Sequence, residues 1–332
     1  MAQRVAYGAL AIVVLVLLVQ LDAEIGTAAL AMGGVAGELL ARGSVLPLAF
    51  LIVVLKAAWE LDALVRARGA EPHRAFACFM TAFLFLCPWL SAGGLLGNDV
   101  QDREGLYWPL TGILFSFLGT GALTLLRGQT AGAVRDVSAT MVIILYSGFL
   151  PSFALQIRCG IGLIGQIGAW LFLFVLLTTK AADIGAYFGG SLFGRHKLAP
   201  KISPGKTIEG AAGGLIFSAS VAVLLGSLGS ILSYFEIPIF SGSRISEIIL
   251  ALRLPFEQTN LSNTLDCLIF GFAISAAGQI GDLVESCFKR DAGAKDSGRI
   301  LPQYGGILDL IDSPVASMPA AWFLLSEVWR VL

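Results

Sequence analysis

The side chains best suited to chemistry gather in one stretch near the C-terminus, residues 281–313, where charges of both signs stand between long apolar segments. If the first part of this stretch is helical, Asp282, Glu285 and Lys289 fall at positions i, i+3 and i+7 and share one face. Paired carboxylates beside a cation suit the binding of a divalent metal ion or of substrate phosphates. We therefore expect the chemistry to take place here.

The second part of the stretch carries another carboxylate pair, Asp309 and Asp312, again three residues apart. Pro302 and the glycines 305–306 precede this pair, and such residues end one element and let the chain turn before the next. Two helix ends are thus predicted to fold towards each other across a loop. This arrangement would bring several carboxylates and cations to one place, as a magnesium ion and a polyphosphate require.

A second polar segment, residues 180–208, follows an earlier apolar stretch. Asp183 and Tyr187 are four residues apart at the predicted end of a helix, and a run of cations follows them. The segment closes on Ser203, Lys206 and Thr207, just before another apolar stretch. Backbone N–H groups, hydroxyls and a point cation that open onto a helix are suited to binding phosphate.

Structural explanations stay open for both segments. Cytoplasmic loops of membrane proteins are commonly basic, and each Lys or Arg near anionic lipid contributes about 1 kcal/mol. Asp183 and Asp282 would form ordinary ion pairs with Lys180 or Lys289 if each stood at a helix end near water. The dipole of a new helix would by itself favour a carboxylate such as Asp309 in the first turn.

The composition places the chain in a membrane. Of its 332 residues, 56% are hydrophobic and 14% are charged, and the mean hydropathy is +0.81, whereas about a quarter of the residues in soluble domains are charged. The sequence predicts an all-α, polytopic bundle of transmembrane helices. We predict about nine spans, at 5–21, 45–64, 75–92, 107–126, 138–156, 161–179, 209–233, 265–282 and 314–331. The apolar segment 25–41 is predicted to be an interfacial or re-entrant piece.

The distribution of Lys and Arg predicts the orientation. Basic residues are concentrated in the loops on one side of the nine spans, which is typical of the cytoplasmic side. The protein would then lie in a bacterial inner membrane, with its N-terminus on the cytoplasmic side. Segments 180–208 and 283–313 would emerge together on the cytoplasmic face, around a polar catalytic cavity. Without a repeat or a linker, residues 1–332 form one predicted membrane domain, with 1–160 as scaffold and 161–332 carrying both polar segments.

The composition also disfavours several functions. The net charge of -1 argues against a nucleic-acid partner. The five cysteines are scattered and the two histidines lie outside the C-terminal stretch, so neither a zinc site nor a Ser-His-Asp arrangement is indicated. A cation-coupled transporter is the alternative from another class, although its polar residues would be expected near the midplane of two related halves. A homodimer is expected only because membrane proteins of this kind commonly form one.

Two long motifs resemble the phosphatidate cytidylyltransferase family, also called CDP-diacylglycerol synthases. The first motif runs from Asp183 to Tyr187 and on from Gly194 to Thr207, and the second covers residues 281–313. The resemblance implies a polytopic enzyme that transfers CMP from CTP to phosphatidic acid. The products would be pyrophosphate and CDP-diacylglycerol, which supplies phospholipid biosynthesis.

The resemblance also implies roles for single residues. Asp282 and Asp309 match the metal-binding aspartates of the family and are expected to hold Mg²⁺, with room for a second cation. Lys206, Lys289 and Arg290 match its phosphate-binding cations. The other candidate substrate-binding residues are Asp183, Tyr187, Ser203, Thr207, Lys295, Asp296 and Asp312.

The chain departs from the family pattern in two places. Gln303 and Tyr304 stand where the family usually has glycine and histidine, and Leu310 stands where it usually has arginine. These changes remove a group that titrates near neutral pH and a bidentate phosphate clamp. They leave three alternatives open: a relative that acts on another lipid phosphate, a CTP-dependent lipid kinase, and an inactive protein that only binds lipid.

Overall fold

The computed structural model describes residues 2–29, 31–96, 107–128, 130–159, 166–234, 264–298 and 305–328. Within these ranges the chain is almost entirely helical, as the sequence predicts. The helices are α1 (Ala2–Ala29), α2 (Gly34–Ala41), α3 (Val45–Ala67), α4 (Arg74–Ala92), α5 (Tyr107–Arg127), α6 (Ala133–Ile144), α7 (Leu150–Cys159), α8 (Gln166–Phe193), α9 (Ile208–Tyr234), α11 (Thr264–Asp291) and α12 (Leu308–Phe323). Two π-helical segments, η1 (Leu145–Phe149) and η4 (Leu324–Val328), continue α6 and α12.

The membrane spans agree largely with the prediction. Six helices in the described ranges are long and apolar enough to cross a membrane, with α6, η1 and α7 acting as one. The pair α2 and α3, bent by 67°, adds a seventh if it forms a single span. These seven correspond to the predicted spans from 45–64 to 265–282. The predicted span 5–21 lies within α1, whereas 314–331 is divided between α12, η4 and residues outside the described ranges.

Three boundaries differ from the prediction. Helix α8 continues to Phe193 and α11 to Asp291, so Asp183 and Asp282 lie within helices instead of at their ends. Segment 25–41 is divided between the end of α1 and the separate helix α2. Helices α8 and α11 extend beyond the predicted apolar spans because a helix that has left the bilayer core needs no apolar side chains to continue.

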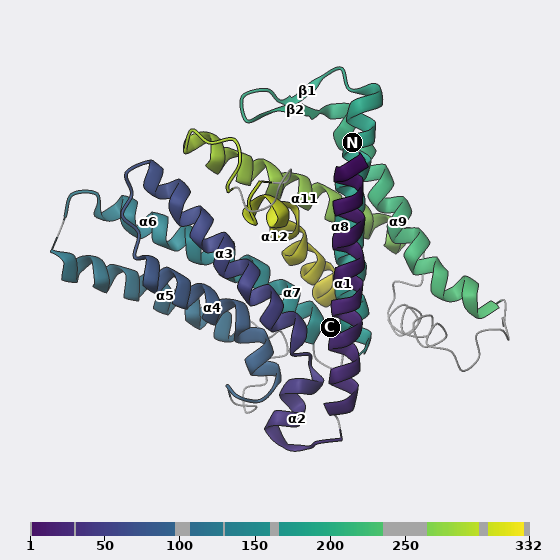
Figure 1. Cartoon of the computed structure of the whole chain (residues 1–332), viewed down its shortest axis with the longest axis horizontal. Helices are drawn as coiled ribbons and strands as arrows, with labels where there is room; N and C mark the ends of the chain where they lie inside the picture. The colour runs from purple at the N-terminus through teal and green to yellow at the C-terminus, as the bar shows by residue number, and fades with distance from the viewer. Residues whose placement is uncertain are drawn as a thin grey trace.

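The segment between α8 and α9 contains a small β-hairpin, although it was predicted to be a loop. Strand β1 (Lys197–Ala199) pairs antiparallel with β2 (Ser203–Thr207), with Lys197 opposite Thr207 and Ala199 opposite Ser203. Figure 1 shows this hairpin projecting from one end of the helical bundle. Strands of three and five residues with few apolar side chains carry no alternating apolar pattern, so the sequence gives no signal for them.

Helix α8 is the centre of the main core. Its residues from Ala169 to Leu176 are all buried, in contact with side chains from α1, α7, α9, α11 and α12. A helix that is apolar on every side is one that neighbours surround. Further along, Gly185 and Gly189 of α8 face Gly213 of α9, where an added Cβ on Gly213 would lie 2.8 Å from the carbonyl oxygen of Gly185. Small residues allow this close approach.

Helix α12 lies beside α11 and reaches α3 at its own beginning (Figure 1). The crossing with α11 is tight, because a Cβ on Gly281 would lie only 2.5 Å from the carbonyl oxygen of Asp312. The fold thereby brings the end of α11, the start of α12 and the middle of α3 together.

Candidate active site

The junction of α11 and α12 centres on Lys289. Its ammonium lies 2.5 Å from Glu285 Oε2 and 2.5 Å from Asp309 Oδ1. Glu285 is fully buried, and the lysine and Asp309 side chains are nearly so. The predicted approach of two helix ends across a loop is confirmed by this contact between α11 and α12.

The carboxylate of Asp309 is held from several sides. Its Oδ2 accepts hydrogen bonds from the backbone N–H groups of Ser297 (2.9 Å) and Gly306 (2.7 Å) and from the Ser297 hydroxyl (2.8 Å). Burial alone would raise the pKa of Asp309, but Lys289 and these donors outweigh burial and lower it. Asp309 is therefore an anion in a fixed orientation.

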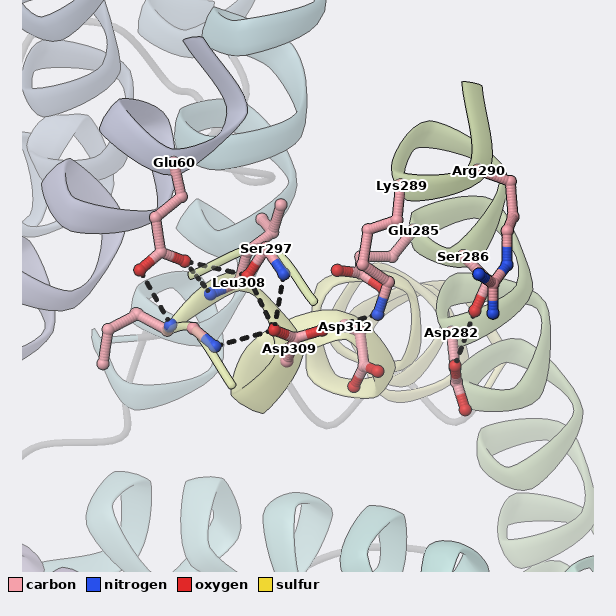
Figure 2. Close-up of polar contacts among 12 residues, drawn as sticks. Glu60, Asp282, Glu285, Ser286, Lys289, Arg290, Ser297, Leu308, Asp309 and Asp312 are labelled. Carbon is pink, nitrogen blue, oxygen red and sulfur yellow. Dashed lines mark hydrogen bonds and ion pairs between the residues drawn. The ribbon is translucent and has the colours of Figure 1, made fainter. Parts of the chain in front are cut away.

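Glu60 approaches the same place from α3. It is 4% exposed, and its Oε1 accepts a hydrogen bond from Ile307 N at 3.1 Å. Its Oε2 accepts a hydrogen bond from Leu308 N at 2.9 Å and lies 3.0 Å from the Ser297 hydroxyl, whose single proton is shared between Glu60 and Asp309. Figure 2 shows Glu60 and Asp309 on either side of these donors. The first N–H groups of α12, which have no partner within the helix, are thus bound by a carboxylate from another helix.

Asp282 forms the second part of the site, on α11. Lys206 of β2 places its ammonium 2.6 Å from Asp282 Oδ2. The Ser286 hydroxyl lies 3.5 Å from the other carboxylate oxygen, at the limit of a hydrogen bond. The two predicted polar segments therefore meet through this ion pair.

Asp312 lies one turn after Asp309. Burial and the neighbouring charge of Asp282 raise the pKa of Asp312 above that of a solvated aspartate, and Lys180 partly opposes this shift. In the described part of the chain its carboxylate accepts one hydrogen bond, from Ser313 N at 2.6 Å. Figure 2 draws no contact between this carboxylate and the other residues shown. Within the described ranges, the Asp312 carboxylate therefore has acceptor positions without a partner.

Asp183 of α8 joins this group. It pairs with Lys180 at 3.1 Å and accepts a hydrogen bond from the Ser313 hydroxyl at 3.0 Å. Lys180 also donates to the carbonyl oxygen of Leu310, at 3.3 Å. The predicted structural ion pair between Asp183 and Lys180 is thus present, and it lies beside α12.

The oxygen ligands of this site are of the kind that Mg²⁺ prefers. No three Asp, Glu, His or Cys side chains of the described ranges converge as a ready-made metal cage. Each of the two predicted ligands, Asp282 and Asp309, instead faces a lysine ammonium. Since Mg²⁺ usually takes one or two carboxylates and completes its shell with phosphate and water, this set fits a site that substrate phosphates would complete.

Several predicted residues have other partners. Arg290 Nε donates to the carbonyl oxygen of Ile202, which ties α11 to the hairpin. The Thr207 hydroxyl accepts a hydrogen bond from Gly210 N at 3.1 Å and so caps the start of α9. Ser203 is half-buried at the beginning of β2. These residues shape the hairpin that carries Lys206.

Three other predicted substrate-binding residues lie on the outside of the protein. Tyr187 is 55% exposed and contacts Phe188, the next residue, with ring centroids 5.6 Å apart. Lys295 and Asp296 are exposed in the segment after α11. Tyr304, the replacement for the family histidine, lies outside the described residues.

The sequence prediction did not include Glu60, Ser297 or Lys180 among the site residues. A signal for Glu60 was present, because a carboxylate inside a predicted span is costly and so points to a function. Ser297 offered no such signal. Its importance comes from the turn that places its hydroxyl between two carboxylates.

The sequence is similar to known proteins over most of its length. Residues 23–328 match the cytidylyltransferase family. The chain is 34% identical over 235 residues to an Escherichia coli (strain K12) protein named "uncharacterized protein YnbB", a match that covers 70% of this chain and 66% of that protein. It is 31% identical over 306 residues to a phosphatidate cytidylyltransferase of Synechocystis sp., covering 86% of this chain and 89% of that enzyme.

A third relative is similar over a shorter length. The chain is 40% identical over 152 residues to a phosphatidate cytidylyltransferase of Haemophilus influenzae, which covers 46% of this chain and 44% of that enzyme. The matches therefore extend over most of the Synechocystis relative and over 66% or less of the other two.

Proposed function

The chain belongs to the cytidylyltransferase family, and from this premise we propose that it transfers CMP from CTP to phosphatidic acid. The observation that carries the proposal is a pair of ion pairs, Lys206 with Asp282 and Lys289 with Asp309. Each pair places a cation for phosphate beside a carboxylate for a metal ion. A site that must assemble two polyanions needs both groups together.

The proposed reaction needs little acid–base chemistry from the protein. An oxygen of the lipid phosphate attacks the α-phosphorus of CTP, and the bond from that phosphorus to the pyrophosphate oxygen breaks. The nucleophile is already an anion at neutral pH, so no general base has to remove a proton. The barrier is mainly repulsion between the two substrates, and positioned cations lower it.

The lysines have the central role in this proposal. Lys206 and Lys289 bind the phosphates of CTP, and Asp282 and Asp309 hold these two ammonium groups in place. The same two carboxylates would hold Mg²⁺, which would supply further neutralisation of the phosphate charge. Asp312, with its open acceptor positions, is the third carboxylate of the site.

The membrane position follows from where the substrates come from. We place the site at the cytoplasmic surface of a bacterial inner membrane, because CTP arrives from water and the lipid from the leaflet. The hairpin and the end of α11 contact each other through Arg290 and Ile202, which supports a common side for both polar segments. Cysteine accessibility at Lys197→Cys in sealed inverted vesicles tests the orientation.

The function is tested with detergent-solubilised protein, phosphatidic acid and CTP labelled on the α-phosphate, with and without Mg²⁺. We expect label to enter the lipid phase with an equal amount of pyrophosphate, and only when Mg²⁺ is present. Label on the γ-phosphate, run in parallel, should stay in water. Lipid labelled from the γ-phosphate instead would show a kinase and contradict the proposal.

A second candidate, transfer of CMP to a different lipid phosphate, is favoured by Leu310. This residue gives the site only a backbone carbonyl, bonded to Lys180, where a guanidinium would bind phosphate in two places. The same assay with other lipid phosphates distinguishes the two acceptors. Faster transfer to one of them than to phosphatidic acid would assign the second function.

A further inference from the structure

We propose that Glu60 is a positioning residue of the active site, through which α3 orients Asp309. This inference rests on the proposed function, since it concerns how the same site is held. The residue lies on α3, in the part of the chain expected to act only as scaffold. Its effect on the reaction would pass through Ser297 and the start of α12.

The chain of contacts is short. Glu60 Oε2 and Asp309 Oδ2 lie 3.0 Å and 2.8 Å from the same hydroxyl, that of Ser297 (Figure 2). Glu60 also binds the N–H groups of Ile307 and Leu308, the residues just before Asp309. Asp309 in turn binds Lys289 through its other oxygen. Three contacts, through Ser297 and Asp309, therefore connect Glu60 to the predicted phosphate-binding ammonium.

The backbone leaves room for this carboxylate only because of two glycines. A Cβ on Gly298 would lie 2.7 Å from Glu60 Oε1. A Cβ on Gly306 would overlap both Glu60 Oε2 and the Ser297 hydroxyl. Real Cβ atoms do not make contacts this close, so a side chain at Gly298 or Gly306 would displace the Glu60 carboxylate. The two glycines therefore let the backbone at these positions approach Glu60.

The donors to Glu60 in the described part of the chain are two backbone N–H groups and one hydroxyl, all neutral. Asp62, on the same helix and equally buried, instead forms ion pairs with Arg66 and Arg74. Asp62 is bound by cations outside the site, whereas Glu60 is bound by the elements that carry Asp309. This contrast makes Asp62 a matched control for the loss of a buried carboxylate from α3.

The first experiment compares the isosteric variants Glu60→Gln and Asp62→Asn. In Glu60→Gln one of the two acceptor oxygens becomes an NH₂ donor that faces Ile307 N or Leu308 N, so the start of α12, which carries Asp309, moves. We expect kcat to fall at least about tenfold while KM for CTP and for lipid changes less than about twofold, the pattern of a lost transition-state interaction. Asp62→Asn should lower the melting temperature and leave kcat of the folded protein unchanged.

A double variant tests whether Glu60 acts on Asp309 through Ser297. Because Ser297 connects Glu60 to Asp309, Ser297→Ala combined with Glu60→Gln should lower kcat no more than the stronger single variant does. Two independent structural losses would multiply instead. Ser297→Ala alone also keeps the test possible if Glu60→Gln does not fold, with an expected loss of about threefold to tenfold in kcat.

Hydrogen exchange tests the same proposal without turnover. In Glu60→Gln the amides of Ser297 and Gly306, which bind Asp309 and not Glu60, should exchange about tenfold faster, and Asp62→Asn should leave them unchanged. Wild-type kcat together with unchanged exchange in Glu60→Gln would overturn the inference. An inactive wild-type protein would instead contradict the proposed function, and exchange would still decide the role of Glu60.

Discussion

Two buried carboxylates in this protein bind the start of a helix that is not their own, and they do so with different surroundings. Asp22 of α1 binds the start of α3, where its Oδ1 accepts hydrogen bonds from the N–H groups of Ser44, Val45 and Leu46 at 2.8 to 3.1 Å. Glu60 of α3 binds the start of α12 in the same manner. Both satisfy N–H groups that a helix leaves without partners.

The surroundings show what each carboxylate is for. Asp22 pairs with Arg158 at 2.7 Å, and both side chains are 0% exposed, so its charge is neutralised inside the protein. Glu60 is bound by neutral donors that connect it to Asp309 and Lys289. A cap with an internal counter-ion stabilises the fold, whereas a cap linked to the site also orients reactive groups.

Asp309→Asn should have the largest effect on the reaction. The asparagine amide cannot balance the charge of Lys289, and its NH₂ group is itself a donor where the carboxylate accepts hydrogen bonds. We therefore expect turnover to fall by about a thousandfold or more. The variant should remain folded in detergent, as gel filtration would show. Near-normal transfer of labelled CMP in this variant would contradict the assignment of Asp309 as a metal ligand.

Asp22→Ala should have the largest effect on stability. It leaves the buried Arg158 guanidinium without its counter-ion, and loss of one partner from a buried pair costs about 3–5 kcal/mol. Thermal unfolding in detergent measures the loss, and kcat of the remaining folded protein should be unchanged. If kcat of Asp22→Ala fell as much as that of Glu60→Gln, the two carboxylates would not differ in their effect on the reaction. Asp22→Asn combined with Arg158→Met should recover much of the stability.

Lys206→Ala should have an intermediate effect. It removes one charged contact to phosphate, which is worth about 1.5–3 kcal/mol, so kcat/KM for CTP should fall about 10- to 100-fold. Lys197→Ala on the same hairpin is the control, because the Lys197 side chain is exposed and makes no hydrogen bond or ion pair in the described ranges, and only its backbone pairs with Thr207. Equal losses in both variants would mean that the hairpin acts by its overall charge.

Tyr187→Phe and Lys295→Ala should have the smallest effects. Both side chains are exposed, and neither makes a hydrogen bond or ion pair with a carboxylate of the site in the described ranges, so transfer should change less than about twofold. A larger loss in Tyr187→Phe would mean that its hydroxyl reaches the lipid substrate. The predicted role of Tyr187 would then stand despite its position in the unliganded protein.

The membrane helices and the meeting of the two polar segments could be predicted from the sequence. Long apolar windows find spans because a bilayer has a definite thickness, and the pairs Lys206–Asp282 and Lys289–Asp309 join residues that motifs had already singled out. Glu60 and Ser297 could not be found in this way. Their contact joins residues 237 positions apart, and the charged stretch that contains Ser297 gives no indication that its hydroxyl meets a carboxylate of α3.

The division of labour among the predicted residues also depends on three-dimensional structure. Thr207 and Arg290 belong to the recognised motifs, yet one caps α9 and the other binds the hairpin backbone. A motif contains residues that shape a site as well as residues that touch the substrate, and sequence spacing alone does not distinguish the two kinds. The hydrogen bonds of each residue do distinguish them.

The π-helical segment η1 joins α6 to α7. A π-helical turn holds an extra residue, and one residue of an α-helix corresponds to about 100° of rotation. Deleting one residue from Leu145–Phe149 should therefore return the turn to regular α-helix and leave Arg158 facing Asp22. Deleting one residue from α7 between η1 and Arg158 would instead rotate Arg158 by about 100° and separate the buried ion pair. The extra residue in η1 is thus one that the helix can lose, whereas the length of α7 before Arg158 is fixed by that pair.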